Sequence, residues 1–307
     1  MLFAAFVFSI MGACIKLASS LYSTSEIVMY RGGIGMVIMS AVIRYNRNTF
    51  RTPFPWHHLW RGILGVTAMW MWFFSISKLP LATGMTLNYM SSIWIAAILC
   101  AGALWRGEKQ REWGTVAAVA LSFVGVVLLL RPTIHADQLF YGMVALVSGI
   151  LSALAYLQVR QLGLLGESEA RVVFYLSTVG AVTGLLGTFY GGSRVSSNLQ
   201  GWHAHGGKGI ALILVIGVCA SVAQVAMTRA YRLGNTLVTA NLQYTGILFS
   251  SAWGVLIWGD FLNWSAWLGI AVILASGFTA TYYNVRNRKA LGESPALDRE
   301  TDPIAAE

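Results

Sequence analysis

Long apolar runs alternate with short polar connections along most of the chain. Each run is close to the roughly 20 residues that an α-helix needs to cross the hydrocarbon core of a bilayer. The pattern therefore predicts an all-α membrane protein with ten transmembrane helices. The expected helices cover approximately Leu2–Ser19, Ser25–Arg44, Leu59–Ser77, Ala82–Trp105, Trp113–Leu130, Leu139–Leu162, Ala170–Tyr190, Gly209–Tyr231, Thr236–Trp258 and Trp264–Tyr283.

The composition supports lipid as the solvent of this fold. Of the 307 residues, 56% are hydrophobic and 11% are charged, whereas soluble domains average about 25% charged residues. The net charge of +9 comes from short basic clusters between the apolar runs, with no basic domain, so we expect no nucleic-acid partner. The three cysteines lie alone in separate apolar runs, which gives no metal-binding spacing, and no cofactor is expected.

Basic residues between the runs predict the orientation, because Lys and Arg accumulate on the cytoplasmic side of membrane proteins. One set of helix ends carries most of them: Arg44, Arg47, Arg51, Arg61, Arg106, Lys109, Arg111, Arg160, Arg171, Arg229 and Arg232. The opposite set carries only Lys78, Arg131, Arg194 and Lys208. Both termini are therefore expected in the cytoplasm.

The segment Leu79–Gly125 is repeated loosely at Leu233–Gly277. Within it, Tyr89-Met90-Ser91 matches Gln243-Tyr244-Thr245. The match divides the chain into two five-helix repeats, at residues 1–131 and 138–285, followed by a polar cytoplasmic tail at 286–307 that is expected to be disordered. Because five is odd, the second repeat enters the bilayer from the opposite face, and the repeats are inverted.

These features resemble the EamA family of the drug/metabolite transporter superfamily. The resemblance rests on short motifs spread over nearly the whole chain: Leu79-Pro80-Leu81-Ala82, Gly107-Glu108, Gly259-Asp260 and Arg31. It implies a multi-pass inner-membrane carrier with a central cavity, walled mostly by the third, fourth, eighth and ninth helices. It also implies substrates such as amino acids, related metabolites or cofactors. Many relatives have proline midway along the fourth and ninth helices, where this chain has Ser91 and Thr245, which leaves open whether these helices are kinked.

Polar residues within the spans are the candidate substrate contacts, because polar groups in a bilayer must face protein or a water-filled cavity. Amides and phenols suit a polar or zwitterionic substrate, since they donate or accept hydrogen bonds without a buried charge. Hydrogen bonding between helices is the alternative role. The candidates are Asn88, Tyr89, Asn241, Gln243, Tyr244, Gln158, Gln224, Trp70, Arg31 and Lys16.

Several candidates have a second interpretation. Arg31 could pair with Glu26, cap a neighbouring helix or attract a substrate carboxylate. Lys16 could extend to the outer headgroups from its helix end. Trp70 could stack on a planar substrate or pack against other helices. The pair His203 and His205 has no third ligand nearby, so we expect a solvated loop and not a metal site.

A carrier that works by alternating access is the function that these features favour, with a small polar metabolite as substrate and export or exchange as the mode. Glu26 is the only acid in any expected span, which argues against proton-coupled antiport of cations and favours uniport or exchange. A larger cofactor-type or nucleoside-containing metabolite, such as S-adenosylmethionine or riboflavin, is the alternative substrate. An enzyme is disfavoured because no acidic pair, metal motif or histidine lies in an expected span, and a channel because no charged ring is visible.

The lipid bilayer and the small-molecule substrate are the expected partners. Small residues spaced four apart in the last helix, Ala271 and Ala275, allow close helix approach. They favour internal packing and leave a homodimer as a possibility.

Overall fold

The computed structural model describes residues 1–105, 138–190, 205–234, 236–260 and 263–290, with the single positions 117, 121, 124, 125, 128 and 203. This part of the chain contains α-helices and no strand. The expected helix Trp113–Leu130 lies almost wholly outside these residues, as does the tail beyond residue 290. The helices are α1 Leu2–Ala18, α2 Thr24–Tyr45, α3 Pro55–Ile76, α4 Leu81–Tyr89, α5 Ser91–Trp105, α7 Leu139–Leu164, α8 Glu169–Tyr190, α9 Gly207–Leu233, α10 Thr236–Leu242, α11 Thr245–Trp258 and α12 Trp264–Ala290.

Helix lengths agree with a membrane protein. In the described part of the chain, α2, α3, α7, α8 and α9 each contain a stretch long and apolar enough to cross a bilayer, and α1 is a shorter apolar helix. Two boundaries differ from the sequence expectation by four residues or more. Helix α3 begins at Pro55, because proline fits the first turn of a helix where no backbone donor is needed. Helix α12 continues to Ala290, so the predicted tail begins inside a helix.

The fourth and ninth expected helices are each interrupted midway, although neither has a proline there. The first break is at Met90, between α4 and α5, and the second at Gln243–Tyr244, between α10 and α11. At the second break the backbone uses the tighter i→i−3 bonding: Gln243 N donates to Ala240 O, and Tyr244 N to Asn241 O. Met90 and Tyr244 keep right-handed helical dihedrals, so the hydrogen-bond ladder is broken while the chain direction is largely kept.

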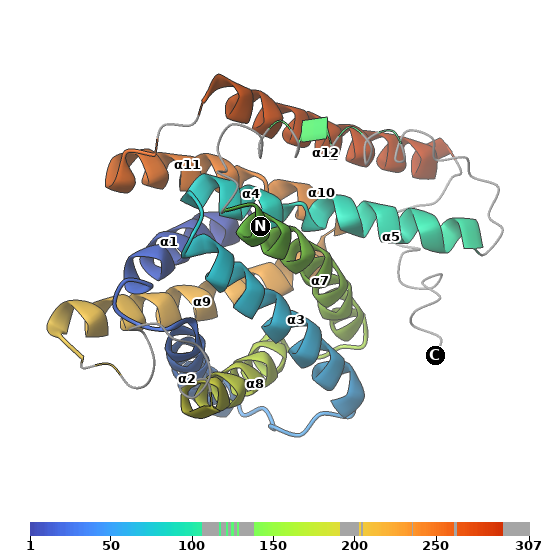
Figure 1. Ribbon diagram of the computed structural model, residues 1–307. Helices are drawn as coiled ribbons and strands as arrows, with labels where there is room; N and C mark the ends of the chain where they lie inside the picture. The colour runs from blue at the N-terminus through green and yellow to red at the C-terminus, as the bar shows by residue number, and fades with distance from the viewer. Residues whose placement is uncertain are drawn as a thin grey trace.

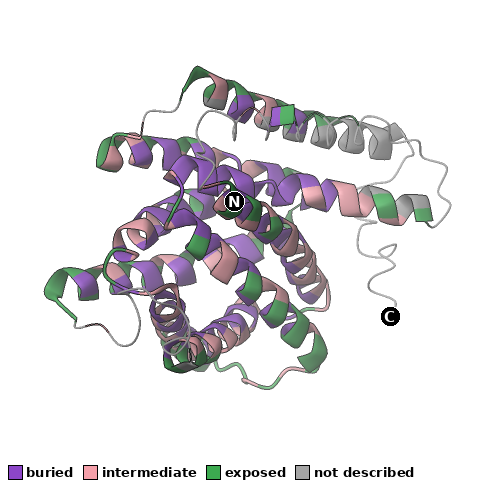
Figure 2. Ribbon diagram, viewed as in Figure 1, coloured by how far each residue is buried: buried purple, intermediate pink, exposed green. Residues whose placement is uncertain are grey.

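The two interrupted helices lie side by side and antiparallel, because α4 contacts α11 while α5 contacts α10 (Figure 1). The breaks face each other. Ser92 Oγ, just after the first break, donates to the carbonyl of Ala240 just before the second, at 2.6 Å. All nine residues of α4 are buried, and Figure 2 shows burial concentrated on α4 and the facing parts of its neighbours. This crossing is the centre of the fold, with α12 packed outside it against α5 and α10.

Helices α2 and α8 pack so closely that their backbones nearly touch. A Cβ atom added to Gly32 would lie 2.4 Å from the backbone nitrogen of Ala181, and one added to Gly184 would lie 2.4 Å from that of Met29. Such close approach is typical of membrane helices. In lipid the hydrophobic effect does not drive helices together, and small residues at the contact allow the backbones to pack closely instead. Gly33, the next residue, has open space around its Cβ position.

We therefore expect Gly32→Leu to destabilise the protein while Gly33→Leu is tolerated. Leucine at position 32 must push α2 away from the α8 backbone, at a cost of about 1–3 kcal/mol or more. Leucine at 33 points into open space between the helices and lipid. The melting temperature of each purified variant in detergent measures the difference. Equal melting temperatures for the two variants would contradict the close α2–α8 contact.

Candidate functional site

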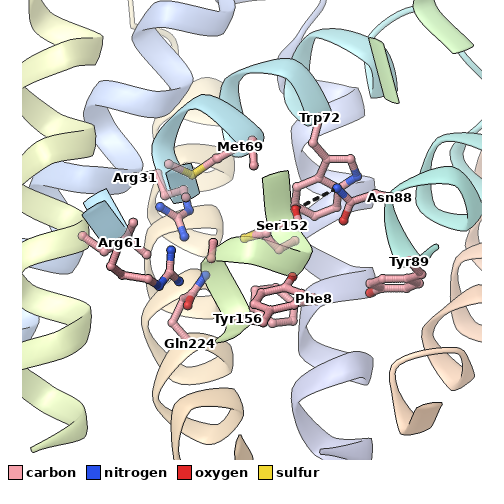
Figure 3. A pocket seen from close by; sticks show the side chains of 15 residues that line it. Phe8, Arg31, Arg61, Met69, Trp72, Asn88, Tyr89, Ser152, Tyr156 and Gln224 are labelled. Atoms are coloured by element: carbon pink, nitrogen blue, oxygen red, sulfur yellow. Dashed lines mark hydrogen bonds between the residues drawn. The ribbon is translucent and has the colours of Figure 1, made fainter. Parts of the chain in front are cut away.

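A small cavity of about 50 Å³ lies where the two halves of the chain meet. Its walls come from α1, α2, α3 and α4 in the first half and from α7, α8 and α9 in the second (Figure 3). Two arginines, an asparagine, a glutamine and several aromatic rings face it. The lining residues are Phe8, Met11, Arg31, Arg61, Gly65, Ala68, Met69, Trp72, Asn88, Tyr89, Ser152, Ala155, Tyr156, Leu176 and Gln224.

The cavity is smaller than the pockets that usually hold small molecules. A water molecule needs about 10–15 Å³ of such space, and pockets for small molecules usually have about 300–1,000 Å³. A cavity of about 50 Å³ therefore holds a few waters, and a metabolite can enter only if the surrounding helices move apart.

Four of the ten candidate contacts line this cavity: Asn88, Tyr89, Gln224 and Arg31. The Asn88 side chain, 4% exposed, donates to Ser148 Oγ at 2.6 Å and to Ser152 Oγ at 3.3 Å, which fixes its amide against α7. The hydroxyl of Tyr89 is buried without a hydrogen-bond partner.

The ring of Tyr89 lies directly on α11. A Cβ atom at Gly246 would be 2.7 Å from the ring edge of Tyr89, so the absence of a side chain at 246 makes room for this residue. Tyr89 therefore touches both the cavity and the interrupted helix of the other half.

Asn241, Gln243 and Tyr244 lie at the break between α10 and α11 and do not line the cavity. All three are buried. Gln243 Nε2 donates to the hydroxyl of Tyr231 at 2.7 Å, and the Tyr231 ring stacks on the cavity residue Tyr156 with centroids 5.5 Å apart. These residues thus form a layer behind the cavity wall.

Gln158, Trp70 and Lys16 are also outside the cavity lining. Gln158 is half-buried, and its Oε1 atom has no hydrogen-bond partner. The Trp70 ring packs on α8, where a Cβ atom at Gly187 would be 2.5 Å from it, so it packs between helices in this conformation.

Lys16 has a protein partner that the sequence did not predict. Its Nζ forms a salt bridge of 3.0 Å with Asp260 and lies 4.6 Å from the centroid of the Trp258 ring. Gly259 ends α11 with a positive φ of 65°, a left-handed conformation that favours glycine. The turn places Asp260 beside Lys16, and the pair joins α1 to the end of α11.

Arg61 is the main cavity residue that the sequence analysis assigned differently. It was counted as a basic residue flanking a span, but its side chain is buried, 3% exposed, and faces the cavity. A Cβ atom at Gly65 would lie 1.8 Å from Arg61 Nη1, so the glycine one helical turn later lets the guanidinium lie along α3. An arginine followed by glycine four residues on is the signal that could have indicated this path. Trp72 and Tyr156 also line the cavity and were not among the candidates.

At one end of the α2–α8 pair, His203 and His205 from the segment before α9 contact residues of the first half. Glu26, fully buried, receives hydrogen bonds from the backbone N of His203 at 3.0 Å and from Ser23 N at 2.8 Å. His203 Nδ1 is 2.7 Å from Glu26 Oε2 and donates to it, because a carboxylate only accepts. His205 contacts the hydroxyl of Tyr30 at 2.7 Å.

These contacts bear on two expectations. The rings of His203 and His205 contact residues of the first half, which the sequence did not predict, while His205 is exposed as expected for a solvated position. Arg31 does not pair with Glu26, whose oxygens are taken by Ser23 and His203.

The opposite end of the α2–α8 pair is closed by a similar cluster around Glu167. Its side chain is 1% exposed and lies 2.7 Å from Arg171 Nε and 3.6 Å from His58 Nε2. The Thr52 hydroxyl also donates to it. Arg171 in turn donates to the carbonyl of Arg51 at 2.9 Å. Each end cluster therefore joins a glutamate from one half to a histidine from the other, with the cavity between them.

Comparison with known proteins agrees with this architecture. Residues 1–131 match the EamA-like transporter family. The pseudopaline exporter of Pseudomonas aeruginosa is 27% identical over 84% of this chain and 86% of its own length. A Helicobacter pylori transporter, whose name specifies no substrate, is 27% identical over 88% of the chain and 89% of its own length.

An S-adenosylmethionine uptake transporter of Rickettsia bellii is 21% identical over 80% of the chain and 79% of its own length. A crystal structure of a protein with 16% sequence identity superposes with a TM-score of 0.62 and covers 91% of this chain and 97% of the other. That likeness shows a shared fold. The family match over residues 1–131 and the transporters that align over most of the chain agree with that fold: the chain is a multi-pass membrane protein that is similar to EamA-like transporters.

Proposed function

We propose that this transporter carries a small polar metabolite through the cavity between its halves by alternating access. The observation that carries the proposal is the cavity itself: buried charged, amide and aromatic side chains from both halves meet there. A transporter site between two halves, next to interrupted helices, is the arrangement expected when the halves rock around bound substrate. The relatives include an exporter and an uptake transporter, so they do not fix the direction of transport.

We also propose that residues 1–131 and 138–285 form inverted repeats in the inner membrane with both termini in the cytoplasm. The antiparallel contact of the two interrupted helices supports the inverted relation. Exposed Arg44 lies in the last turn of α2, and exposed Arg47 and Arg51 follow it, which supports a cytoplasmic location for the Glu167 cluster. The Glu26 cluster then lies at the outer face.

The end clusters support a gating role in this cycle. Each holds a buried carboxylate of one half against a histidine of the other. A hydrogen bond to a charged group contributes about 1.5–3 kcal/mol, so losing one shifts a two-state equilibrium by about tenfold or more. We propose that the Glu26 cluster closes the outer end and the Glu167 cluster the inner end, and that one opens while the other stays closed.

Solute transport is the direct test of the function. Purified protein in liposomes, loaded with unlabelled solute, is expected to show saturable counterflow of at least one labelled solute from a panel of glutamate, citrate, phenylalanine and S-adenosylmethionine. Asn88→Ala should reduce the rate several-fold, because it removes the amide that faces the cavity. Thr279→Ala on α12, whose hydroxyl bonds only within its own helix, is the matched control. Non-saturable flux, or equal loss in both variants, would refute the carrier assignment.

Cysteine accessibility tests the gates. In a background with the native cysteines replaced, Ala155→Cys reports on the cavity wall. Glu26→Gln should increase labelling of this cysteine by an impermeant maleimide applied from the outer face, and Glu167→Gln should increase labelling from the cytoplasmic face. The two variants serve as controls for each other. An increase from the same face in both would show that the clusters are not opposing gates.

A further inference from the structure

The cavity contains two buried positive charges and no acidic side chain among the residues that the structure describes. Arg31 and Arg61 each have 3% of their surface exposed. Every acid in the described part of the chain has a basic or histidine partner elsewhere. The pairs are Glu26 with His203, Glu167 with Arg171 and His58, Glu169 with Arg232, and Asp260 with Lys16.

An uncompensated charge in this position is costly. A buried ion loses its hydration, and within a bilayer it must find a partner or a water-filled cavity. The Nε atoms of both arginines are buried without a hydrogen-bond partner. The two guanidinium groups also lie within electrostatic reach of each other, so their repulsion adds to the cost. A counter-ion of opposite charge would relieve both penalties.

The surrounding groups are arranged for an oxyanion. Figure 3 shows the guanidinium groups of Arg31 and Arg61 close together, with the amide of Gln224 beside them. A guanidinium presents a planar fork of N–H donors that matches carboxylate and phosphate oxygens. Gln224 Oε1 is buried without a partner, and its amide can donate to the same anion from the NH₂ side.

The other end of the cavity has a different character. Trp72 supplies aromatic surface there and Asn88 supplies a fixed amide, while the rings of Phe8 and Tyr156 lie between this end and the arginines (Figure 3). A ligand that satisfies both ends has an oxyanion group at one end and an apolar or planar part, with a polar substituent, at the other.

We propose that Arg31 and Arg61 together form an oxyanion subsite, and that the transported solute is therefore a metabolite bearing a carboxylate or phosphate group, with net negative or zwitterionic charge. This inference rests on the proposed function, since it assigns the substrate class of the same cavity. Solutes whose only charge is positive are excluded, because the arginine pair repels them.

Binding to the full-length protein in detergent at low salt tests the subsite. Succinate, citrate and inorganic phosphate are the probes, and succinamide is the uncharged analogue of succinate. We expect at least one of the three anions to raise the melting temperature in a saturable way, as mass action requires, and succinamide to have no effect. If only succinate and citrate raise the melting temperature, the subsite binds carboxylate. If only phosphate raises it, the subsite binds phosphate.

The variants Arg31→Gln and Arg61→Gln should weaken anion binding by about tenfold or more, since each removes one charged fork. Arg229→Gln, at an exposed position on α9, is the matched control and should bind as the unmodified protein does. The unliganded Arg31→Gln and Arg61→Gln proteins should melt at the same or a higher temperature, because each substitution removes an unpaired buried charge. A clear fall in both would instead indicate a purely structural role.

The two proposals can fail separately. If the anions bind through Arg31 and Arg61 but no solute shows saturable counterflow, the transport assignment fails and the oxyanion subsite stands. If a neutral or cationic solute shows saturable counterflow that both glutamine variants retain, the carrier stands and the subsite is refuted. Equal stabilisation by succinate and succinamide would also refute the subsite.

Discussion

A charge inside the bilayer region must have a partner, and this constraint organises the whole molecule. Lys16, Glu26 and Glu167 are each buried or half-buried, and each contacts a side chain of the other half: Asp260, His203 and His58 in turn. All three contacts connect a residue before position 131 to one after position 138. The same pairs that neutralise charges therefore also hold the two halves together at their ends. Among the buried charges of the described residues, only the two cavity arginines lack such a partner, so the cavity is the place where a bound anion would balance the charge.

The backbone obeys a related constraint. A break in a helix exposes N–H and C=O groups, and in lipid these are satisfied only inside the protein. Here the breaks at Met90 and at Gln243–Tyr244 lie against each other, and the Ser92 hydroxyl binds the carbonyl of Ala240 across the contact. The interruptions are tolerated because they are buried together. Tyr89 belongs to α4 and contacts α11. Movement of either interrupted helix would therefore displace Tyr89 in the cavity wall.

Much of the helical pattern could be predicted from the sequence, because hydrophobic runs of bilayer length have few other structures available to them. The repeat match placed Tyr89-Met90-Ser91 opposite Gln243-Tyr244-Thr245, which marked the location of both breaks without showing that the helices are interrupted. Proline was the expected signal for a break, and its absence left the question open. The relevant cause is tertiary: the Ser92 hydroxyl donates to the carbonyl of Ala240 at the second break, while the Ser91–Gln243 bond and the contact of Tyr89 with Gly246 hold the two breaks together.

The site was less predictable, since hydropathy assigns a residue to a span or to its flank but does not show which way its side chain points. Arg61 lies near a helix end and was counted as a flanking charge, yet Gly65 allows it to fold along α3 into the cavity. Lys16 lies at a comparable distance from its own helix end, but there the turn at Gly259 supplies an acid. A single glycine therefore matters in each case. Gly65 makes room for the Arg61 side chain in the cavity, and Gly259 positions Asp260 as the partner of Lys16. The positions of such glycines help to show where a charged side chain points, which the charges alone do not.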